Sequence, residues 1–241
     1  MSDRRLASAL RAAEVPPFHA MAMSARATEW ARLGHDVHYL QVGQPSTGAP
    51  LGARRAVIEA LERGDSLGYT NAPGLPELAQ RITRHYTDQY SATVPSERIM
   101  IVGGASAGFT LAFLASFDAG DRVAIVEPGY PCYRNTLIAL GITPVPIQVG
   151  PESRWAPTVE MLEAAGPLDG LVVASPSNPT GTSLDATTIA SLVEYCDRQG
   201  IQIVADEIYH GITYGSRSAS FTSHSTRAIV INSFSKYFSM T

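Results

Sequence analysis

Residues 201–207 read IQIVADE, a run whose composition is typical of a buried strand. It is rich in isoleucine and valine and shows no regular alternation with polar residues, which is typical of a strand covered on both faces. Four similar runs occur elsewhere in the 241-residue chain: RIMIVGG (98–104), DRVAIVEP (121–128), GLVVASP (170–176) and RAIVINS (227–233). The sequence therefore predicts a sheet of buried strands.

Helical segments lie between several of these strands. The clearest is DATTIASLVEYCDRQG (185–200), in which Asp185 is placed to cap the first turn and Gly200 to end the helix. Two others are ASAGFTLAFLASF (105–117) and PCYRNTLIALG (131–141). Strands that alternate with helices predict an α/β fold, with three αβα layers around a mainly parallel sheet.

The first 97 residues follow a different pattern. Segments rich in proline and glycine interrupt them, at GQPSTGAPLG (43–52) and NAPGLP (71–76). Between these segments we expect a helix over about 18–33, a strand at VHYLQVG (37–43), and helices near 52–63 and 74–90.

The composition argues against several classes of function. Charged residues make up 17% of the chain and the formal net charge is −4, with no arginine-rich face, so a nucleic-acid surface is not expected. No run of about 18 apolar residues occurs, so we expect no membrane span. The six histidines form no paired motif and predict no metal site. The two cysteines lie far apart, which favours a reducing, cytoplasmic location.

Polar or glycine-rich residues follow each of the five predicted strands. The carboxyl ends of parallel strands share one edge of the sheet, and ligands bind at that edge. The segments in question are GGASAG (103–108), EPGYP (127–131), SPSNPTG (175–181), DEIYHG (206–211) and SFSK (233–236). We therefore expect a ligand site built from these segments.

The segment GASAG (104–108) joins a predicted strand to a predicted helix. The free N–H groups of a first helical turn and the helix dipole both favour a phosphate. A tight turn between strand and helix explains the same residues equally well, so the segment alone does not decide between them.

Asp206 follows a buried strand directly, where a carboxylate is costly unless a partner holds its charge. It is either a helix cap or ion-pair partner, or a fixed negative charge aimed at a cationic ring nitrogen. Tyr209 would reach the same ligand if a helical turn follows. Pro176 and Pro179 fix the backbone around Asn178 and present its amide in one direction, with a simple turn as the alternative.

Lys236 is the only lysine in the chain, and the other seventeen lysine or arginine side chains are all arginine. It follows the last predicted strand and has serines on its N-terminal side. A lysine in an enclosed crevice is a candidate nucleophile toward a carbonyl, whereas a surface lysine would have no such role.

A phosphate cradle, a carboxylate for a ring nitrogen, an oriented amide and phenol, and a carbonyl-reactive lysine together describe a pyridoxal phosphate site. From about residue 40 onward the chain closely resembles the class I/II aminotransferases of the aspartate aminotransferase superfamily, fold type I. The segments that carry the resemblance are VGQP (42–45), YTNAPGLPELAQRI (69–82), GGASAGFTLAF (103–113), EPGYPCY (127–133), SPSNPTG (175–181), DEIYHG (206–211) and SFSK (233–236).

The resemblance implies roles around the cofactor ring. Lys236 would hold the aldehyde as an internal aldimine, and Asp206 would keep the pyridine nitrogen protonated. Asn178 and Tyr209 would hydrogen-bond the ring hydroxyl oxygen, and Tyr130 would stack on the ring. Lys236, Asp206 and Tyr209 are thus the implied catalytic residues of an aminotransferase that moves an amino group between an amino acid and a 2-oxo acid.

The resemblance also implies the phosphate and substrate contacts. The backbone amides of Ala105 and Ser106, with the hydroxyls of Ser233 and Ser235, would bind the phosphate. Tyr69 would reach the phosphate of a neighbouring subunit, which implies a homodimer. Gly43 would approach the substrate carboxylate, and Asn178 would also contact the substrate.

The chain departs from the family pattern in two places. Ala107, Gly108 and Phe109 replace a longer polar residue followed by Ala-Leu. The family motif continues after the lysine into a glycine–arginine stretch, and a later segment supplies an arginine for the substrate carboxylate; neither is present before Thr241. We expect an arm and part of a small domain at 1–48, a shortened cofactor-binding domain at 49–241, and a chain that is poorly soluble or binds cofactor weakly.

Three alternatives remain open at the level of sequence. A carbon–sulfur β-lyase of the same fold would share every cofactor residue. A module that binds an effector without catalysis is a second reading, although no helix-turn-helix segment precedes residue 40. An inactive fragment is the third.

Overall fold

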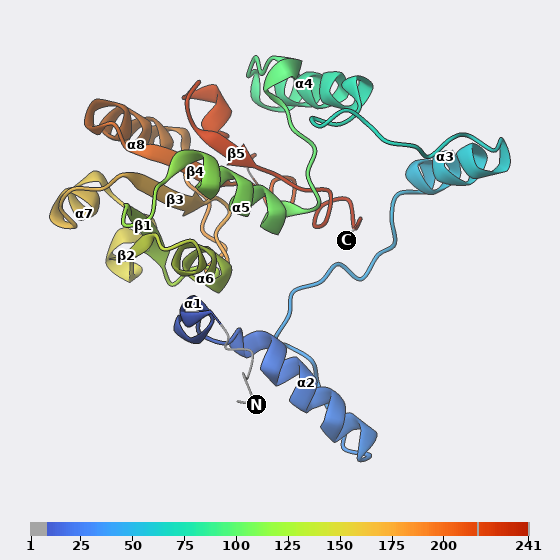
Figure 1. Ribbon diagram of the computed structural model, residues 1–241, viewed down its shortest axis with the longest axis horizontal. Helices are drawn as coiled ribbons and strands as arrows, with labels where there is room; N and C mark the ends of the chain where they lie inside the picture. The colour runs from blue at the N-terminus through green and yellow to red at the C-terminus, as the bar shows by residue number, and fades with distance from the viewer. Residues whose placement is uncertain (1–8, 216, 241) are drawn as a thin grey trace, which may run out of the picture.

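The core of the molecule is a five-stranded parallel sheet with strand order β2-β1-β3-β4-β5 (Figure 1). The computed structural model describes residues 9–215 and 217–240. The strands are β1 (Arg122–Glu127), β2 (Thr143–Gln148), β3 (Gly170–Ala174), β4 (Gln202–Asp206) and β5 (Ile229–Ile231). Four of the five strands expected from the apolar runs are therefore present, and all pair in parallel.

Helices cover both faces of this sheet, which confirms the three-layer arrangement. The buried residues of α5 and α6 pack on one face with Val172 of β3, whereas those of α7 and α8 pack on the other face with Leu171 and Val173. The helices are α1 (Leu10–Glu14), α2 (His19–Arg32), α3 (Leu51–Glu62), α4 (Pro76–Tyr90), α5 (Ala105–Ser116), α6 (Pro131–Ala139), α7 (Val159–Ala164) and α8 (Ala186–Gln199), with 3₁₀ turns at Ser96–Arg98, Pro151–Ser153 and Phe221–Ser223.

Local signals explain the ends of α8. The side chain of Asp185 accepts a hydrogen bond from the amide of Thr188 at 2.7 Å, and Gly200 adopts a left-handed conformation at φ 75° directly after the last turn. Both features satisfy backbone groups that a helix leaves free at its ends. The predicted cap and stop of this helix are confirmed.

Two of the predicted strands are absent. Residues 37–43 form no strand, and neither do residues 98–104, where Ser96–Arg98 is a 3₁₀ turn and the chain then runs extended. The amide of Ile101 donates to the carbonyl of Pro73 at 2.9 Å, not to a neighbouring strand. Among the described residues neither segment pairs with a strand, and a strand is defined by its ladder with a partner.

Strand β2 was not expected from the sequence. Its residues TPVPIQ include Pro144 and Pro146, and proline argues against a central strand. The strand lies at the edge of the sheet and pairs only with β1, which is where prolines are tolerated.

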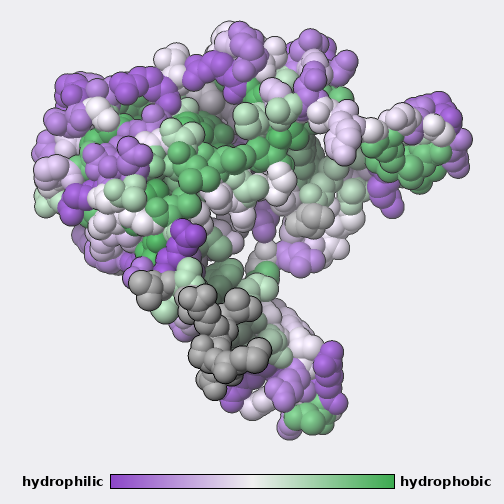
Figure 2. Space-filling model, viewed as in Figure 1, coloured by the Kyte–Doolittle hydropathy of each residue, from purple (hydrophilic) through white to green (hydrophobic). Residues whose placement is uncertain are grey.

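Helices α2 and α3 project from the sheet and its covering helices (Figure 1). Neither helix has a buried residue. On α3 the side chains of Val57, Ile58 and Leu61 are each more than half exposed, and Figure 2 shows this helix with a hydrophobic surface at the right of the view. The N-terminal helices therefore present apolar side chains that the described chain does not cover.

Candidate active site

Asp206 is the last residue of β4, at the carboxyl edge of the sheet, and its side chain is buried. One carboxylate oxygen accepts a hydrogen bond from the amide of Ile208 at 3.0 Å, and the other accepts one from the hydroxyl of Tyr133. Burial raises the pKa of Asp206, while the two hydrogen bonds and the charge of Lys236 act in the opposite direction. The carboxylate is therefore fixed in place and lacks a direct ion-pair partner within the described residues.

Tyr133 is a site residue that the sequence reasoning missed. It lies in the first turn of α6, with Pro131 at the start of the helix, and its ring is buried. Burial and the neighbouring carboxylate of Asp206 raise the pKa of Tyr133, so its hydroxyl stays a hydrogen-bond donor. The signal that could have found it is its spacing of three residues after Tyr130, which places both at the entry to one helix.

Asn178, Tyr209 and Lys236 come together on the same edge. The amide nitrogen of Asn178 donates to the hydroxyl of Tyr209 at 3.5 Å, and the amine of Lys236 lies 5.9 Å from the centre of the Tyr209 ring. Burial first, and then the charge of Asp206, raise the pKa of Tyr209, while the hydrogen bond from Asn178 lowers it. Three residues that the sequence placed after three different strands are thus neighbours.

Tyr130 precedes α6 and belongs to an aromatic cluster beside Asp206. Its ring lies 5.5 Å from that of Tyr133 and 5.8 Å from that of Phe18, both edge to face. Burial, with the thiol of Cys132 next, raises the pKa of Tyr130. Phe18 and Tyr133 therefore fix the orientation of the Tyr130 ring, on which a flat ligand could stack.

The N-terminus of α5 and the segment after β5 form a second polar region. Gly104 precedes α5 with φ 87°, a conformation that favours glycine, and Ala105 and Ser106 begin the helix. The helix packs closely on β5, since a side chain at Gly108 would meet Ile231 at 3.3 Å.

Two residues beyond Ile231, the chain brings serine hydroxyls into this region. The hydroxyls of Ser233 and Ser235 lie 2.8 Å apart, and the amide of Ser235 donates to Ser233 Oγ at 3.1 Å. The free amides at the start of α5 and the hydroxyls of Ser233 and Ser235 are hydrogen-bond donors of the kind that bind a phosphate.

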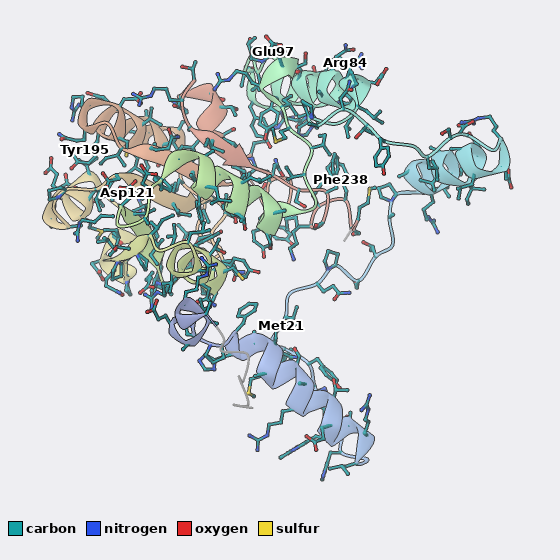
Figure 3. The ribbon with its side chains drawn as sticks, viewed as in Figure 1. Met21, Arg84, Glu97, Asp121, Tyr195 and Phe238 are labelled. Atoms are coloured by element: carbon teal, nitrogen blue, oxygen red, sulfur yellow. The ribbon has the colours of Figure 1, made fainter. Side chains whose placement is uncertain are left out.

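A cleft of about 450 Å³ opens beside Lys236. The N-terminal segment crosses it, and the hydroxyl of Thr47 lies 2.7 Å from that of Ser239. Figure 3 shows the neighbouring C-terminal segment, with Phe238 labelled. The lining residues are Gly43, Gln44, Pro45, Ser46, Thr47, Tyr209, Ile212, Lys236, Tyr237 and Ser239. Gly43 therefore lies in the wall of the cleft beside Lys236.

Tyr69 is the one predicted site residue that the structure does not bring to this edge. It lies between α3 and α4, and its side chain is fully exposed. Nothing in the described chain holds it against the site.

The donor set fits pyridoxal phosphate. The buried carboxylate of Asp206 suits a protonated ring nitrogen, the start of α5 with the two serine hydroxyls suits the phosphate, and the amine of Lys236 suits the aldehyde. Residues 9–215 and 217–240 contain no group of three or more His, Cys, Asp and Glu side chains that could hold a metal ion. Over the same ranges, no helix has both the length and the apolar character to cross a membrane.

The fold is that of the type I pyridoxal-phosphate transferases, because solved aminotransferases superpose on nearly the whole of this chain. The chain belongs to the class I and II aminotransferases, since the model of that family matches residues 35–241. Members of this family use pyridoxal 5′-phosphate.

Individual relatives agree with this placement. The chain is 47% identical to a valine–pyruvate aminotransferase of Mycobacterium tuberculosis and 34% identical to an aspartate aminotransferase of Geobacillus stearothermophilus, covering 100% and 97% of this chain and 62% and 61% of those proteins. A crystal structure of an aminotransferase from Mycobacterium tuberculosis superposes with a TM-score of 0.93 at 46% identity over 98% of this chain and 61% of that one.

A more distant solved structure shows the same fold. The aspartate aminotransferase of Thermus thermophilus with maleate matches with a TM-score of 0.92 at 26% identity, over 98% of this chain and 62% of that one. The chain thus spans about three fifths of the length of these relatives.

Proposed function

We propose that this chain binds pyridoxal phosphate through Lys236 and serves an aminotransferase that exchanges an amino group between an amino acid and a 2-oxo acid. The observation that carries the proposal is the placement of Asp206, a buried carboxylate at the end of β4 held by Tyr133, on the same edge as Tyr209 and Lys236. Family membership supports it.

When bound, pyridoxal phosphate withdraws electrons from the substrate bond that is to be broken. Asp206 would supply the fixed negative charge that keeps the ring nitrogen protonated, and the hydrogen bonds from Tyr133 and Ile208 hold its two oxygens. Asn178 and Tyr209 would orient the ring through its hydroxyl oxygen, and Tyr130 would stack on the ring. The polar region of Ala105, Ser106, Ser233 and Ser235 anchors the phosphate.

Lys236 has two tasks that arginine cannot share. Its amine would hold the cofactor through the aldehyde, and when free it would accept the proton from the substrate Cα. Arginine stays protonated at any physiological pH, so it can neither form this bond nor act as the base. Lys236 is the only lysine in a chain that otherwise uses arginine, as expected if this position needs an amine that can lose its proton.

We further propose which residues contact the substrate, how two copies associate, how the chain divides into domains and where the protein is located. Gly43 and Asn178 contact the substrate, since Gly43 lines the cleft beside Lys236. Two copies form a homodimer in which Tyr69, exposed here, reaches the phosphate of the other copy. Residues 1–48 act as an arm and part of a small domain, 49–241 as the cofactor-binding domain, and the free Cys132 and Cys196 fit a cytoplasmic location.

The test is the attachment of the cofactor to this chain, because the chain spans about three fifths of its relatives. Purified protein is incubated with pyridoxal phosphate, reduced with borohydride and digested, and the modified peptide is found by mass spectrometry. We expect a reduced adduct on Lys236, no adduct in Lys236→Ala or Lys236→Arg, and unchanged circular dichroism in Lys236→Arg. A parent digest without an adduct on the peptide that contains Lys236 would exclude the proposed site.

A further inference from the structure

The segment DEIYHG (206–211) carries two interleaved pairs of side chains at the same spacing. Asp206 and Tyr209 form the pair that faces the proposed cofactor site. Glu207 and His210 form the second pair, one residue later in each case, and both are buried, with 0% and 5% of their surface exposed. No role in the proposed chemistry uses this second pair.

Glu207 is fixed in the interior by donors from the segment after it. Ser220 Oγ lies 2.9 Å and 3.1 Å from its two oxygens, and the amide of Phe221 donates at 2.7 Å. Its own amide donates to the carbonyl of Ile231 in β5 at 2.8 Å. Burial raises the pKa of Glu207 to about 7, against these hydrogen bonds, and the charge of Asp206 raises it further.

His210 links this carboxyl group to α4. Its Nδ1 lies 2.9 Å from the hydroxyl of Tyr90 and 3.5 Å from Oε2 of Glu207. Burial lowers the pKa of His210 to about 4, His85 adds to this effect, and the carbonyl of Ser175 acts against it. The imidazole is therefore neutral, and its Nδ1 shares a hydrogen bond with the Tyr90 hydroxyl whose direction depends on the tautomer.

Tyr90 carries the connection onward to the segment before Lys236. Burial, followed by the charge of Glu207, raises the pKa of Tyr90 to about 12, so its hydroxyl remains a donor. Its ring lies 5.5 Å from that of Tyr86, whose hydroxyl accepts from Asn232 Nδ2 at 3.4 Å. Asn232 Oδ1 in turn accepts the amide of Ser233 at 2.7 Å.

We propose that Glu207, His210 and Tyr90 are positioning residues: they anchor the turn 206–211 to α4 and so hold Asp206 and Tyr209 in the geometry that the cofactor requires. Glu207 and His210 are buried and fixed in the interior. Asp206 and Tyr209 alternate with them along the same short backbone, so fixing one pair restricts the other. The inference rests on the proposed roles of Asp206 and Tyr209.

The first test needs no cofactor. Tyr90→Phe removes the hydroxyl that bonds His210 and leaves the ring, and Tyr195→Phe is the matched control. Tyr195 is a buried tyrosine of α8 whose hydroxyl makes no hydrogen bond to the turn 206–211 among the described residues, and it is labelled in Figure 3. We expect backbone amides in 207–212 to exchange about threefold or more faster in Tyr90→Phe, because local opening follows lost anchoring contacts, and at the parent rate in Tyr195→Phe.

The second test measures the site itself. The affinity for pyridoxal phosphate, followed by absorbance, should fall about five- to tenfold in Tyr90→Phe and in His210→Leu, which removes both ring nitrogens. His210→Asn, which retains an acceptor for Tyr90, should recover part of the loss. The pH midpoint of the bound cofactor's absorbance should move in Tyr90→Phe and stay constant in Tyr195→Phe.

The outcomes separate this inference from the proposed function. Parent-like exchange of 207–212 in both Tyr90→Phe and His210→Leu would overturn the anchoring role, whatever the cofactor does. Faster exchange with unchanged affinity and unchanged midpoint would show an anchor of the fold alone, which would overturn the positioning role. A parent chain that forms no adduct on Lys236 would refute the proposed function, while the exchange rates would still decide the anchoring.

Discussion

Tyr133 offers a way to test how Asp206 keeps its charge. Its hydroxyl donates to Asp206 and lowers the pKa of that carboxyl against the effect of burial. Tyr133→Phe removes this donor and leaves the ring in the aromatic cluster. The pKa of Asp206 then rises further, and the neutral acid no longer matches a protonated ring nitrogen.

We expect Tyr133→Phe to bind pyridoxal phosphate about tenfold more weakly, since a hydrogen bond to a charged group contributes about 1.5 kcal/mol or more. The loss should set in at a higher pH than in the parent as the solution is acidified. Affinity measured by absorbance across a pH series checks both points. Tyr214→Phe is the control, because Tyr214 is 95% exposed; equal behaviour of the two variants would contradict the prediction.

Glu207 makes the stability of the chain depend on pH. Its pKa in the folded chain is about 7, raised from an ordinary value of 4.5. The protonated form is favoured on folding, so this contribution is fully present below 4.5 and is lost as the pH rises through 7. Glu207→Gln stays neutral, so its unfolding temperature should fall less than that of the parent between about pH 5 and about pH 8.

Thermal unfolding followed by circular dichroism at the two pH values measures this difference. Glu163→Gln, an exposed position on α7, should keep the pH dependence of the parent. A pH dependence in Glu207→Gln as steep as in the parent would show that another group is responsible.

The sequence predicted part of the site because those residues follow strands directly. Asp206 ends β4 and Lys236 follows β5, and the parallel sheet alone brings these positions to one edge. Tyr133 and Tyr90 could not be predicted in the same way. Their hydroxyls reach Asp206 and His210 only through the packing of α6 and α4, which local pattern does not determine.

At the level of elements, the start of β3 is packed against the end of α5. A side chain at Gly170 would place its Cβ 2.3 Å from Cζ of Phe117. Gly170→Ala forces the ring or the strand to move, and overpacking of this kind costs about 1–3 kcal/mol. Chemical denaturation should show this loss in the free energy of unfolding.

The matched control is Gly52→Ala in α3. A Cβ at Gly52 meets nothing within 4 Å, and alanine is a better helix former than glycine by about 0.5–1 kcal/mol. This variant should be neutral or slightly more stable. A Gly170→Ala protein as stable as the parent would mean that the strand and the ring adjust at no cost.

The elements that were predicted well differ from the others in what supports them. Helix α8 carries its own cap, stop and apolar face, so its limits follow from local residues. The expected strand at 98–104 had the right composition but has no partner strand within the described chain. Strand β2 contains two prolines and was not expected, and it forms because its backbone pairs with that of β1. Strands depend on neighbours that may be distant in sequence, and helices largely do not.

At the scale of the whole molecule, α2 and α3 must be covered if they are to persist. Helices of 14 and 12 residues without buried side chains are marginal in water. We expect their amides to exchange rapidly in dilute protein and more slowly as the concentration rises and copies associate through these faces. Hydrogen exchange together with sedimentation velocity over a concentration series measures both.

A pair of substitutions on α3 provides the control for this association. Val57→Gln with Leu61→Gln removes exposed apolar side chains and leaves the core unchanged. The double variant should stay monomeric at concentrations where the parent associates. Equal association of the two proteins would show that α3 is not the contact.

The two prolines of β2 determine where the sheet can grow. The amides of Thr143 and Val149 donate to carbonyls of Asp121 and Glu127, so alternate residues between them face β1, and Pro144 and Pro146 face outward. An incoming strand finds no amide donor at either proline. The prolines therefore disfavour edge-to-edge association at β2, whereas β5 (Ile229–Ile231) carries no proline and is the edge at which a further strand pairs more readily.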